Sequence, residues 1–155
     1  MNTIDVVAVG YGDPVPRALV ASALADLAQR YGGDGDSTPI DDADFAPPVG
    51  SFLVARVDRI PAGCGGWRTL ATDPTVAEIK RMYTDPRWRG LGVATTVLRA
   101  IEESARAAGK ARIALETGRR QPEAIALYRK LGYEVIPNFG HYRDHAGCVS
   151  FGRPL

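Results

Sequence analysis

A glycine-rich turn joins a segment with strand periodicity to a segment with helical periodicity, and it fixes a strand-turn-helix order in the middle of the chain. The turn reads Asp-Pro-Arg-Trp-Arg-Gly-Leu-Gly over residues 85–92. Gly90 and Gly92 permit unusual backbone dihedrals and let a ligand approach the main chain closely. The first turn of a helix offers unpaired N–H groups and a positive dipole end, and Arg87 and Arg89 add formal charge. The sequence therefore predicts a phosphate or pyrophosphate site here.

Three known phosphate-binding patterns can be compared with this turn. A P-loop closes with Gly-Lys-Ser/Thr, whereas Gly92 is followed by valine and alanine. A dinucleotide fingerprint has glycine or alanine three residues after Gly92, where this chain has Thr95, and the preceding strands look antiparallel. The pattern Arg/Gln-x-x-Gly-x-Gly/Ala fits at Arg87, Gly90 and Gly92.

Hydrophobic periodicity predicts the remaining elements. The expected strands cover residues 3–9, 51–57, 60–70, 75–84, 111–117, 133–136 and 147–151. The expected helices cover residues 17–31, 93–108 and 121–131. A meander followed by a β-α-β-α-β tail predicts the α/β class, with a mixed, largely antiparallel sheet of six or seven strands and helices on both faces. At 155 residues, we expect a single domain over residues 1–155.

Composition excludes several classes of protein. Hydrophobic residues make up 45% and charged residues 24%, a globular balance. A formal net charge of +1 argues against a nucleic-acid partner. Two cysteines and two histidines are too few for a disulfide framework or a metal site. No stretch approaches the roughly 18 apolar residues of a membrane span, and no basic residue precedes Arg17, so we expect a cytoplasmic protein without a membrane partner.

Two blocks of sequence resemble the GCN5-related N-acetyltransferase (GNAT) superfamily. The first is Met-Tyr-Thr-Asp-Pro at residues 82–86, running into the glycine turn, and the second is Ala-Ile-Ala-Leu-Tyr-Arg-Lys-Leu-Gly-Tyr at residues 124–133. Their order and spacing match the family over about residues 51–155, and the first 50 residues match only as a strand and a helix. The resemblance implies a GNAT-like acyl-CoA N-acyltransferase fold with two splayed strands. It also implies direct acetyl transfer from acetyl-CoA, as co-substrate, to a primary amine, without a metal.

The resemblance also assigns the donor site to the strand end, the glycine turn and the next helix. Main-chain groups of Met82 and Thr84 would pair with the pantetheine arm, and N–H groups of residues 87–94 would hold the pyrophosphate. The expected cofactor-binding residues are Met82, Tyr83, Thr84, Arg87, Arg89, Gly90, Leu91, Gly92, Val93, Ala94 and Gln121. Gln121 stands where family members often carry asparagine, which departs from the family pattern.

Amide formation requires a deprotonated amine, a donor to the developing oxyanion and a proton for the thiolate. The N–H of Met82 is a candidate oxyanion donor. Tyr128 is the candidate acid because the family's matching tyrosine points at the thioester sulfur. From helical spacing alone, Tyr128 also fits a core tyrosine whose hydroxyl finds a backbone partner.

Two carboxylates are candidates for the general base. Glu78 lies four residues before Met82, and even spacing on a strand predicts that the two share a face. Glu78 also fits an ion pair with Lys80 or Arg81. Glu116, near the end of the following strand, is the rival base, or binds the acceptor instead.

The acceptor stays open at the level of sequence. Residues 34–50 hold five aspartates and no lysine or arginine, which fits either a solvated loop or an acidic wall for a cationic acceptor. His141, Arg143 and His145 lie in a loop that could shape the acceptor site. The acceptor is then a small-molecule amine or a peptide amine, and the resemblance is compatible with a homodimer. An acyl-CoA-binding sensor without turnover is the alternative.

Overall fold

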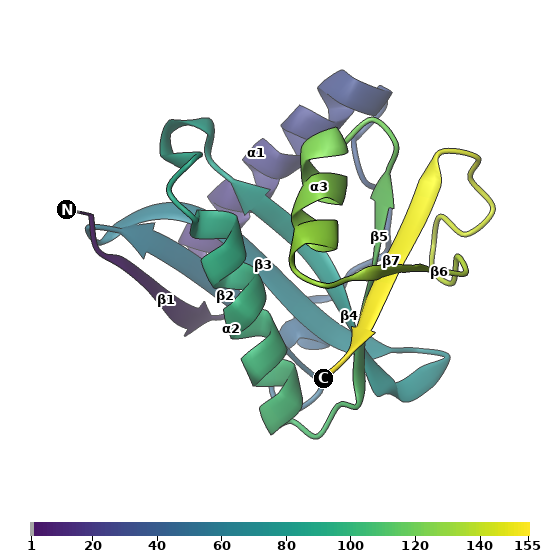
Figure 1. Cartoon of the computed structure of the whole chain (residues 1–155). Coiled ribbons are helices and arrows are strands. Elements are labelled where there is room, and N and C mark those ends of the chain that lie inside the picture. The colour runs from purple at the N-terminus through teal and green to yellow at the C-terminus, as the bar shows by residue number, and fades with distance from the viewer. Residues whose placement is uncertain (1) are drawn as a thin grey trace.

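Seven strands form one sheet in the computed structural model, which describes residues 2–155 (Figure 1). The strand order is β1-β2-β3-β4-β5-β7-β6. The strands are β1 (Ile4–Val9), β2 (Gly50–Val57), β3 (Ile60–Leu70), β4 (Asp73–Thr84), β5 (Arg112–Gly118), β6 (Glu134–Ile136) and β7 (Cys148–Pro154). Only β4 and β5 are parallel, and the other neighbours are antiparallel. The predicted mixed, largely antiparallel sheet is confirmed.

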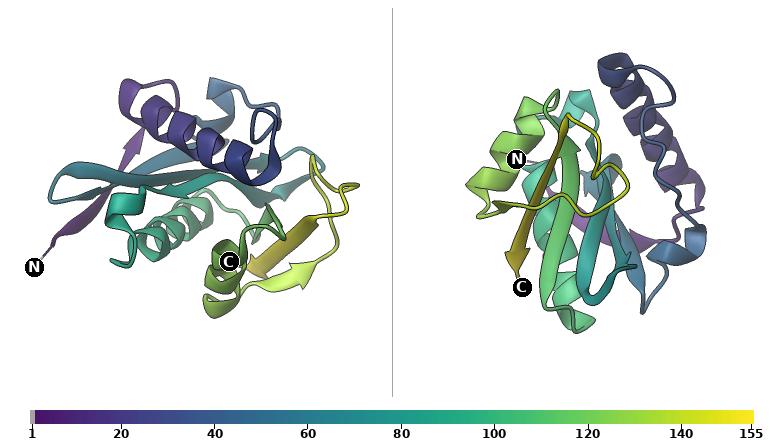
Figure 2. Two further views of the ribbon diagram at one scale, coloured as in Figure 1. Left: turned by 90° about the horizontal axis from the view of Figure 1, so that it is seen from above. Right: turned by 90° about the vertical axis from the view of Figure 1, so that its right-hand side faces the viewer.

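Helices cover both faces of the sheet (Figure 2). Helix α1 (Pro14–Tyr31) lies on one face, and α2 (Val93–Ala107) and α3 (Pro122–Lys130) lie on the other. Helix α1 begins three residues before the expected start, because proline is tolerated in the first turn of a helix. Two single-turn 3-10 helices, η1 (Asp42–Phe45) and η2 (Pro86–Trp88), were not predicted, since one turn leaves no hydrophobic repeat to detect.

Each face of the sheet buries its own apolar cluster. On the α2 face, Ile101 and Leu98 pack with Trp67 and Phe151, all nearly inaccessible to solvent. On the α1 face, Leu19 belongs to a cluster that includes Phe45 and Phe52. The two clusters fix α1 and α2 against the sheet, because burial of large apolar side chains is the main stabilising term in a domain of this size.

Strands β4 and β5 are paired at four positions, and their carboxyl ends diverge beyond them (Figure 1). Their pairing runs from Val76 with Arg112 to Ile79 with Leu115. Beyond Ile79, β4 has no partner on β5 in the described register. The main chain of residues 80–84 therefore lies along an open edge.

A β-bulge in β4 changes which face its side chains occupy. Gly66 pairs with Lys80 and Cys64 pairs with Tyr83, so two β4 residues face one β3 residue, and Arg81 adopts a left-handed φ of 62°. Lys80 and Arg81 consequently reach the same group on the α1 face, Asp36.

Met82 turns to the opposite face. A Cβ added at Gly65 would lie 2.5 Å from Met82 Sδ and 3.0 Å from Ile101 of α2. Glu78 instead contacts Arg68, which also binds Asp44 of η1 on the α1 face. The prediction that Glu78 and Met82 share a face is therefore wrong, because the bulge breaks the strand period of two between them.

Candidate active site

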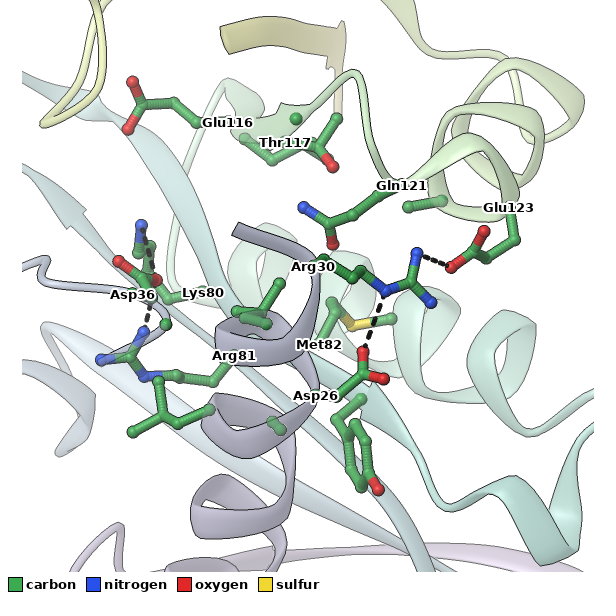
Figure 3. A pocket seen from close by; sticks show the side chains of 18 of the residues that line it. Asp26, Arg30, Asp36, Lys80, Arg81, Met82, Glu116, Thr117, Gln121 and Glu123 are labelled. Carbon is green, nitrogen blue, oxygen red and sulfur yellow. Dashed lines mark hydrogen bonds and ion pairs between the residues drawn. The ribbon is translucent and has the colours of Figure 1, made fainter. Parts of the chain in front are cut away.

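A cavity of about 740 Å³ lies where β4 and β5 diverge (Figure 3). Its walls come from α1, the loop after α1, β4, the start of α2, β5 and α3. It brings together most of the residues predicted for the site: Met82, Tyr83, Thr84, Arg89, Gly90, Gly92, Val93, Ala94, Glu116, Gln121 and Tyr128. Among the predicted residues, Glu78, Arg87 and Leu91 do not line it.

The glycine turn has the backbone geometry that the sequence predicts. Gly90 and Gly92 have φ values of +79° and +85°, in the left-handed region that disfavours other residues. A Cβ at either position would meet no atom within 4 Å, so conformation and not crowding accounts for these glycines. Gly92 caps α2 without a side-chain hydrogen bond, which leaves the N–H groups of the first helical turn available to an anion.

Two polar groups border this turn on the cavity side. Arg89 lines the cavity, and its Nε lies 3.4 Å from the carbonyl oxygen of Thr84. The indole N–H of Trp88 is buried and has no hydrogen-bond partner among residues 2–155. A buried donor without a partner is unfavourable unless a ligand accepts from it. Arg87 points outward and pairs with Asp85 at 3.3 Å.

Tyr128 lies on α3 with 5% of its surface exposed. Its ring packs edge-to-face against Tyr133, with centroids 5.6 Å apart. Its side chain lines the cavity. Burial raises the pKa of Tyr128 above its ordinary value. The hydroxyl therefore stays protonated at neutral pH and is able to donate.

Glu116 presents one carboxylate oxygen that no protein group satisfies. Its Oε2 accepts the N–H of Tyr142 at 3.0 Å. Its Oε1 is buried and has no partner in the part of the chain that the structure describes. Gly140 sits directly against this carboxylate, where any Cβ would collide with it. Glu116 lines the cavity, and a ligand N–H group that reached this oxygen would satisfy it.

Glu78 occupies a different environment. It is 3% exposed, and its Oε1 accepts a hydrogen bond from Arg68 Nε at 2.9 Å. The alternative prediction of an ion pair was right in kind but wrong in partner, because Arg68 lies directly opposite Glu78 in the β3–β4 register. Glu78 lines a second, smaller cavity of about 310 Å³ that includes His141 and Arg143.

A buried ionic cluster, which sequence reasoning missed, lines the main cavity (Figure 3). Asp36, in the loop after α1, pairs with Arg81 and lies 3.8 Å from Lys80 Nζ. Lys80 Nζ also donates to Thr38 Oγ1 at 3.0 Å. Burial raises the pKa of Asp36, but Lys80, hydrogen bonds from Thr38 and Arg81 outweigh it, and the pKa lies well below its usual range. The neighbouring cations Lys80 and Arg81 could have predicted this cluster only if the β-bulge, which puts both side chains on one face, had also been predicted.

The same cluster joins two loops over the cavity. Tyr142 OH donates to Asp36 Oδ1 at 2.8 Å, and the N–H of Ser37 donates to Tyr142 OH at 2.7 Å. His141 Nε2 lies 3.1 Å from Ser37 Oγ, and His145 lines the cavity. The acidic loop of residues 34–50 is thus neither simply solvated nor simply an acidic wall. Its Asp36 forms ion pairs with Lys80 and Arg81 of the sheet.

Arg30 of α1 reaches α3 across the cavity mouth (Figure 3). It pairs with Glu123 and with Asp26, the latter at 3.3 Å, and its Nη1 donates to the carbonyl oxygen of Arg120 at 3.0 Å. Nothing in the periodicity of α1 distinguished this arginine from an ordinary surface residue.

Within residues 2–155, no group of three or more His, Cys, Asp or Glu side chains could hold a metal ion. No helix in the same range is long and apolar enough to cross a membrane. Cys64 is buried, and this burial raises its pKa to about 12, so its thiol is not a reactive nucleophile.

Comparison with known proteins gives a consistent family. The model of the Acetyltransferase (GNAT) family matches residues 21–133. An IAA acetyltransferase of Azospirillum brasilense is 37% identical over 136 residues, covering 85% of this chain and 88% of that protein. The human N-acetylaspartate synthetase is 32% identical over 136 residues, 85% of this chain but only 40% of the relative.

Solved structures share the whole fold. A Klebsiella pneumoniae structure described as an acyl-CoA N-acyltransferase has a TM-score of 0.82 and 28% identity, over 99% of this chain and 98% of that one. A GNAT family acetyltransferase from Elizabethkingia anophelis with acetyl-CoA bound has a TM-score of 0.68, with 98% of each chain covered; at 16% identity it supports the fold alone. The chain therefore belongs to the acetyltransferase (GNAT) family, the acyl-CoA-dependent N-acetyltransferases.

Proposed function

We propose that this enzyme transfers an acetyl group from acetyl-CoA directly to a primary amine, with no covalent enzyme intermediate. The observation that carries the proposal is the single cavity into which the glycine turn, Tyr128 and Glu116 all open. A diphosphate-binding turn, a protonated donor and a carboxylate acceptor are the groups that such a transfer needs.

The donor site extends from β4 to the first turn of α2. Acetyl-CoA supplies an acyl group activated as a thioester. Met82, Tyr83 and Thr84 lie on the open edge of β4, where an extended pantetheine arm would add as a strand. The N–H groups of residues 90–94, with Arg89, would hold the pyrophosphate, and Leu91 and Arg87 border that position from outside.

Two further side chains fit the donor. The unpartnered indole N–H of Trp88 is a donor for an acceptor atom of the pantetheine or pyrophosphate. Gln121 caps α3 and donates from Nε2 to Tyr31 OH at 3.3 Å, so its amide is already partly engaged. We therefore assign Gln121 a wall position and place the polar contacts on the β4 edge and the turn.

The reaction moves the acetyl group from the thioester sulfur to the amine nitrogen, and two protons move with it. The C–N bond forms as the C–S bond breaks. Glu116 takes the proton that the attacking amine loses, directly or through one water, and Tyr128 donates its proton to the departing thiolate sulfur. The N–H of Met82 stabilises the charge that develops on the carbonyl oxygen. Glu78 has no part in this scheme, because Arg68 holds it outside the cavity.

The test is an amine-dependent thiol-release assay, with the acetylated product identified by mass spectrometry. Purified protein, acetyl-CoA and a panel of primary amines should yield free CoA and the N-acetyl product in equal amounts. Release of CoA without any acetylated amine, or stable acetylation of the protein itself, would refute direct transfer. Absence of acetyl-CoA consumption with every amine in the panel, together with absence of saturable acetyl-CoA binding, would refute the donor assignment.

A further inference from the structure

The ionic cluster at the cavity carries more positive than negative charge. Lys80 and Arg81 have side chains only 5% and 7% exposed, and they share one carboxylate, Asp36, which is 14% exposed. Burying a charge is unfavourable unless it is paired. One aspartate cannot neutralise two cations, so the cluster keeps a formal charge of +1 at the cavity wall. A second carboxylate, supplied by a ligand, would balance it.

Hydrogen-bond donors of the cluster also stay available. Of the three N–H groups of the Lys80 ammonium, the described residues take one, at Thr38 Oγ1. Arg81 uses Nη1 for Asp36 and makes a long contact of 3.5 Å from Nε to Tyr11 OH. No protein partner for Arg81 Nη2 exists in residues 2–155. Both side chains line the cavity, so these donors are placed to meet a ligand.

Asp36 does not compete strongly for the remaining donors. Its Oδ1 accepts from the N–H and the hydroxyl of Thr38, at 2.9 and 2.6 Å, and from Tyr142 OH. Its Oδ2 is taken by Arg81. The Asp36 carboxylate is held by the two loops and by Arg81. Lys80 Nζ, 3.8 Å from Asp36 Oδ2, is the more weakly bound of the two cations.

The opposite charge lies close by, at Glu116. Tyr142 connects the two sites, because its N–H donates to Glu116 Oε2 at 3.0 Å and its hydroxyl donates to Asp36 Oδ1 at 2.8 Å. Tyr142 therefore bridges the Glu116 carboxylate and the Asp36 carboxylate of the cationic cluster. Figure 3 shows both charged groups on the wall away from Gln121 and Glu123. A ligand with an amine and a carboxylate would meet a complementary partner at each end.

We propose that Lys80 and Arg81 form a carboxylate subsite, and that the acceptor is an amino-acid-like amine whose ammonium or amine lies at Glu116. The inference rests on the proposed function, since it names the class of acceptor for the same transfer. Its specificity comes from charge: an amine without a carboxylate leaves the extra cation unpaired, and a ligand carboxylate pairs it through charge-assisted hydrogen bonds.

The first test compares acceptors that differ only in this charge. The matched pairs are L-aspartate with L-asparagine, β-alanine with β-alaninamide, and L-phenylalanine with L-phenylalaninamide. We expect the carboxylate member of at least one pair to have a kcat/KM about ten- to a hundredfold higher. The pair of L-phenylalanine and L-phenylalaninamide is the most stringent of the three. The amine of the amide is more readily deprotonated, which by itself would favour the member without a carboxylate.

The second test removes the cations one at a time. Lys80→Met keeps the length of the side chain, and Arg81→Asn keeps a residue that tolerates a left-handed φ. Each should raise the KM for the preferred carboxylate acceptor about tenfold or more and bring the paired acceptors close to equality, with the KM for acetyl-CoA unchanged. Arg56→Met is the matched control, because Arg56 is another sheet arginine paired with an aspartate, Asp5, outside the cavity.

A binding measurement makes the result independent of turnover and of folding of the variants. Calorimetric titration of the CoA-saturated wild-type protein with β-alanine and with β-alaninamide, and with L-phenylalanine and L-phenylalaninamide, should show tighter binding of the carboxylate member of at least one pair. Equal use of both members of every pair, or preference for the uncharged members, would overturn the carboxylate subsite while leaving acetyl transfer intact. Absence of acetyl-CoA binding, by contrast, would overturn the proposed function itself.

Discussion

At the scale of single residues, Tyr128 combines a buried side chain with a position on the wall of the cavity. Its raised pKa keeps the hydroxyl protonated, as the proposed donation of that proton to the departing thiolate requires. The resemblance of residues 124–133 to the GNAT superfamily predicted Tyr128 as the acid, whereas helical spacing alone also fits a core tyrosine. The block is contiguous in sequence, so it can be recognised without knowledge of the fold.

The Tyr128→Phe variant removes the proton donor and keeps the ring packing against Tyr133. We expect kcat to fall about a hundredfold, with little change in the KM for acetyl-CoA, because general acid catalysis contributes about that much. Steady-state thiol release measures both constants. An unchanged kcat would remove Tyr128 from the acid role.

The choice of base separates two glutamates with different surroundings. Glu116→Gln keeps the acceptor for Tyr142 N–H but cannot take a proton, so kcat/KM for the amine should fall about a hundredfold. The loss should shrink at alkaline pH, where more of the amine is already deprotonated. Glu78→Gln is the comparison, and it should change kcat/KM far less, since Glu78 lies outside the cavity. The opposite order would make Glu78 the base.

At the scale of elements, the bulge in β4 decides which side chains enter the cavity. Strand periodicity predicted the strand itself within two residues, but it assigned Glu78 and Met82 to one face. A bulge depends on the register with β3 and on the left-handed φ of Arg81, neither of which one sequence displays. The ionic cluster was hidden for the same reason, since alternation would place Lys80 and Arg81 on opposite faces.

The close packing of β3 against this bulge can be tested at Gly65. A Cβ there would lie 2.5 Å from Met82 Sδ and 3.0 Å from Ile101 Cδ1, so Gly65→Ala should lower the free energy of unfolding by about 1–3 kcal/mol. Chemical denaturation measures this change. Gly147→Ala is the control, because its Cβ would meet nothing nearer than 3.4 Å. Equal stability of the two variants would contradict the packing described.

At the scale of the whole molecule, Asp36 connects the sheet to two loops that come from distant parts of the sequence. The aspartate joins β4 cations to Tyr142 and Thr38. Hydrophobic patterning predicted the seven strands and the three α-helices within a few residues, because the spacing of apolar residues along the chain reflects which face of each element is buried. Contacts between loops depend on the folded arrangement and leave no pattern along the chain. The set of contacts that Asp36 makes with Tyr142 and Thr38, here called the clasp, could therefore not be predicted.

This clasp makes stability depend on pH. The folded-state pKa of Asp36 lies below its ordinary value of 3.8, so its contribution is present above that value and is lost as the pH falls below it. Asp36→Asn should lower the free energy of unfolding at neutral pH by about 3 kcal/mol, since it leaves buried cations unpaired. The difference from wild type should begin to narrow at about pH 4 and should continue to narrow as the pH falls further. Denaturant titrations at these pH values measure the free energy of unfolding, with Asp34→Asn at an exposed position as the control. A difference between wild type and Asp36→Asn that stayed constant with pH would contradict this role of Asp36.

Donor binding at the glycine turn is tested most directly by calorimetric titration of acetyl-CoA into three proteins. These are the wild type, Gly92→Glu and Gly109→Glu. Gly109 ends the same helix region with the same φ of +85° and the same open surroundings, so it matches Gly92 in everything but position. We expect saturable one-site binding in the wild type and in Gly109→Glu, and a Kd at least tenfold weaker in Gly92→Glu, where a carboxylate enters the anion site. Equal affinity in all three proteins would show that the pyrophosphate binds elsewhere.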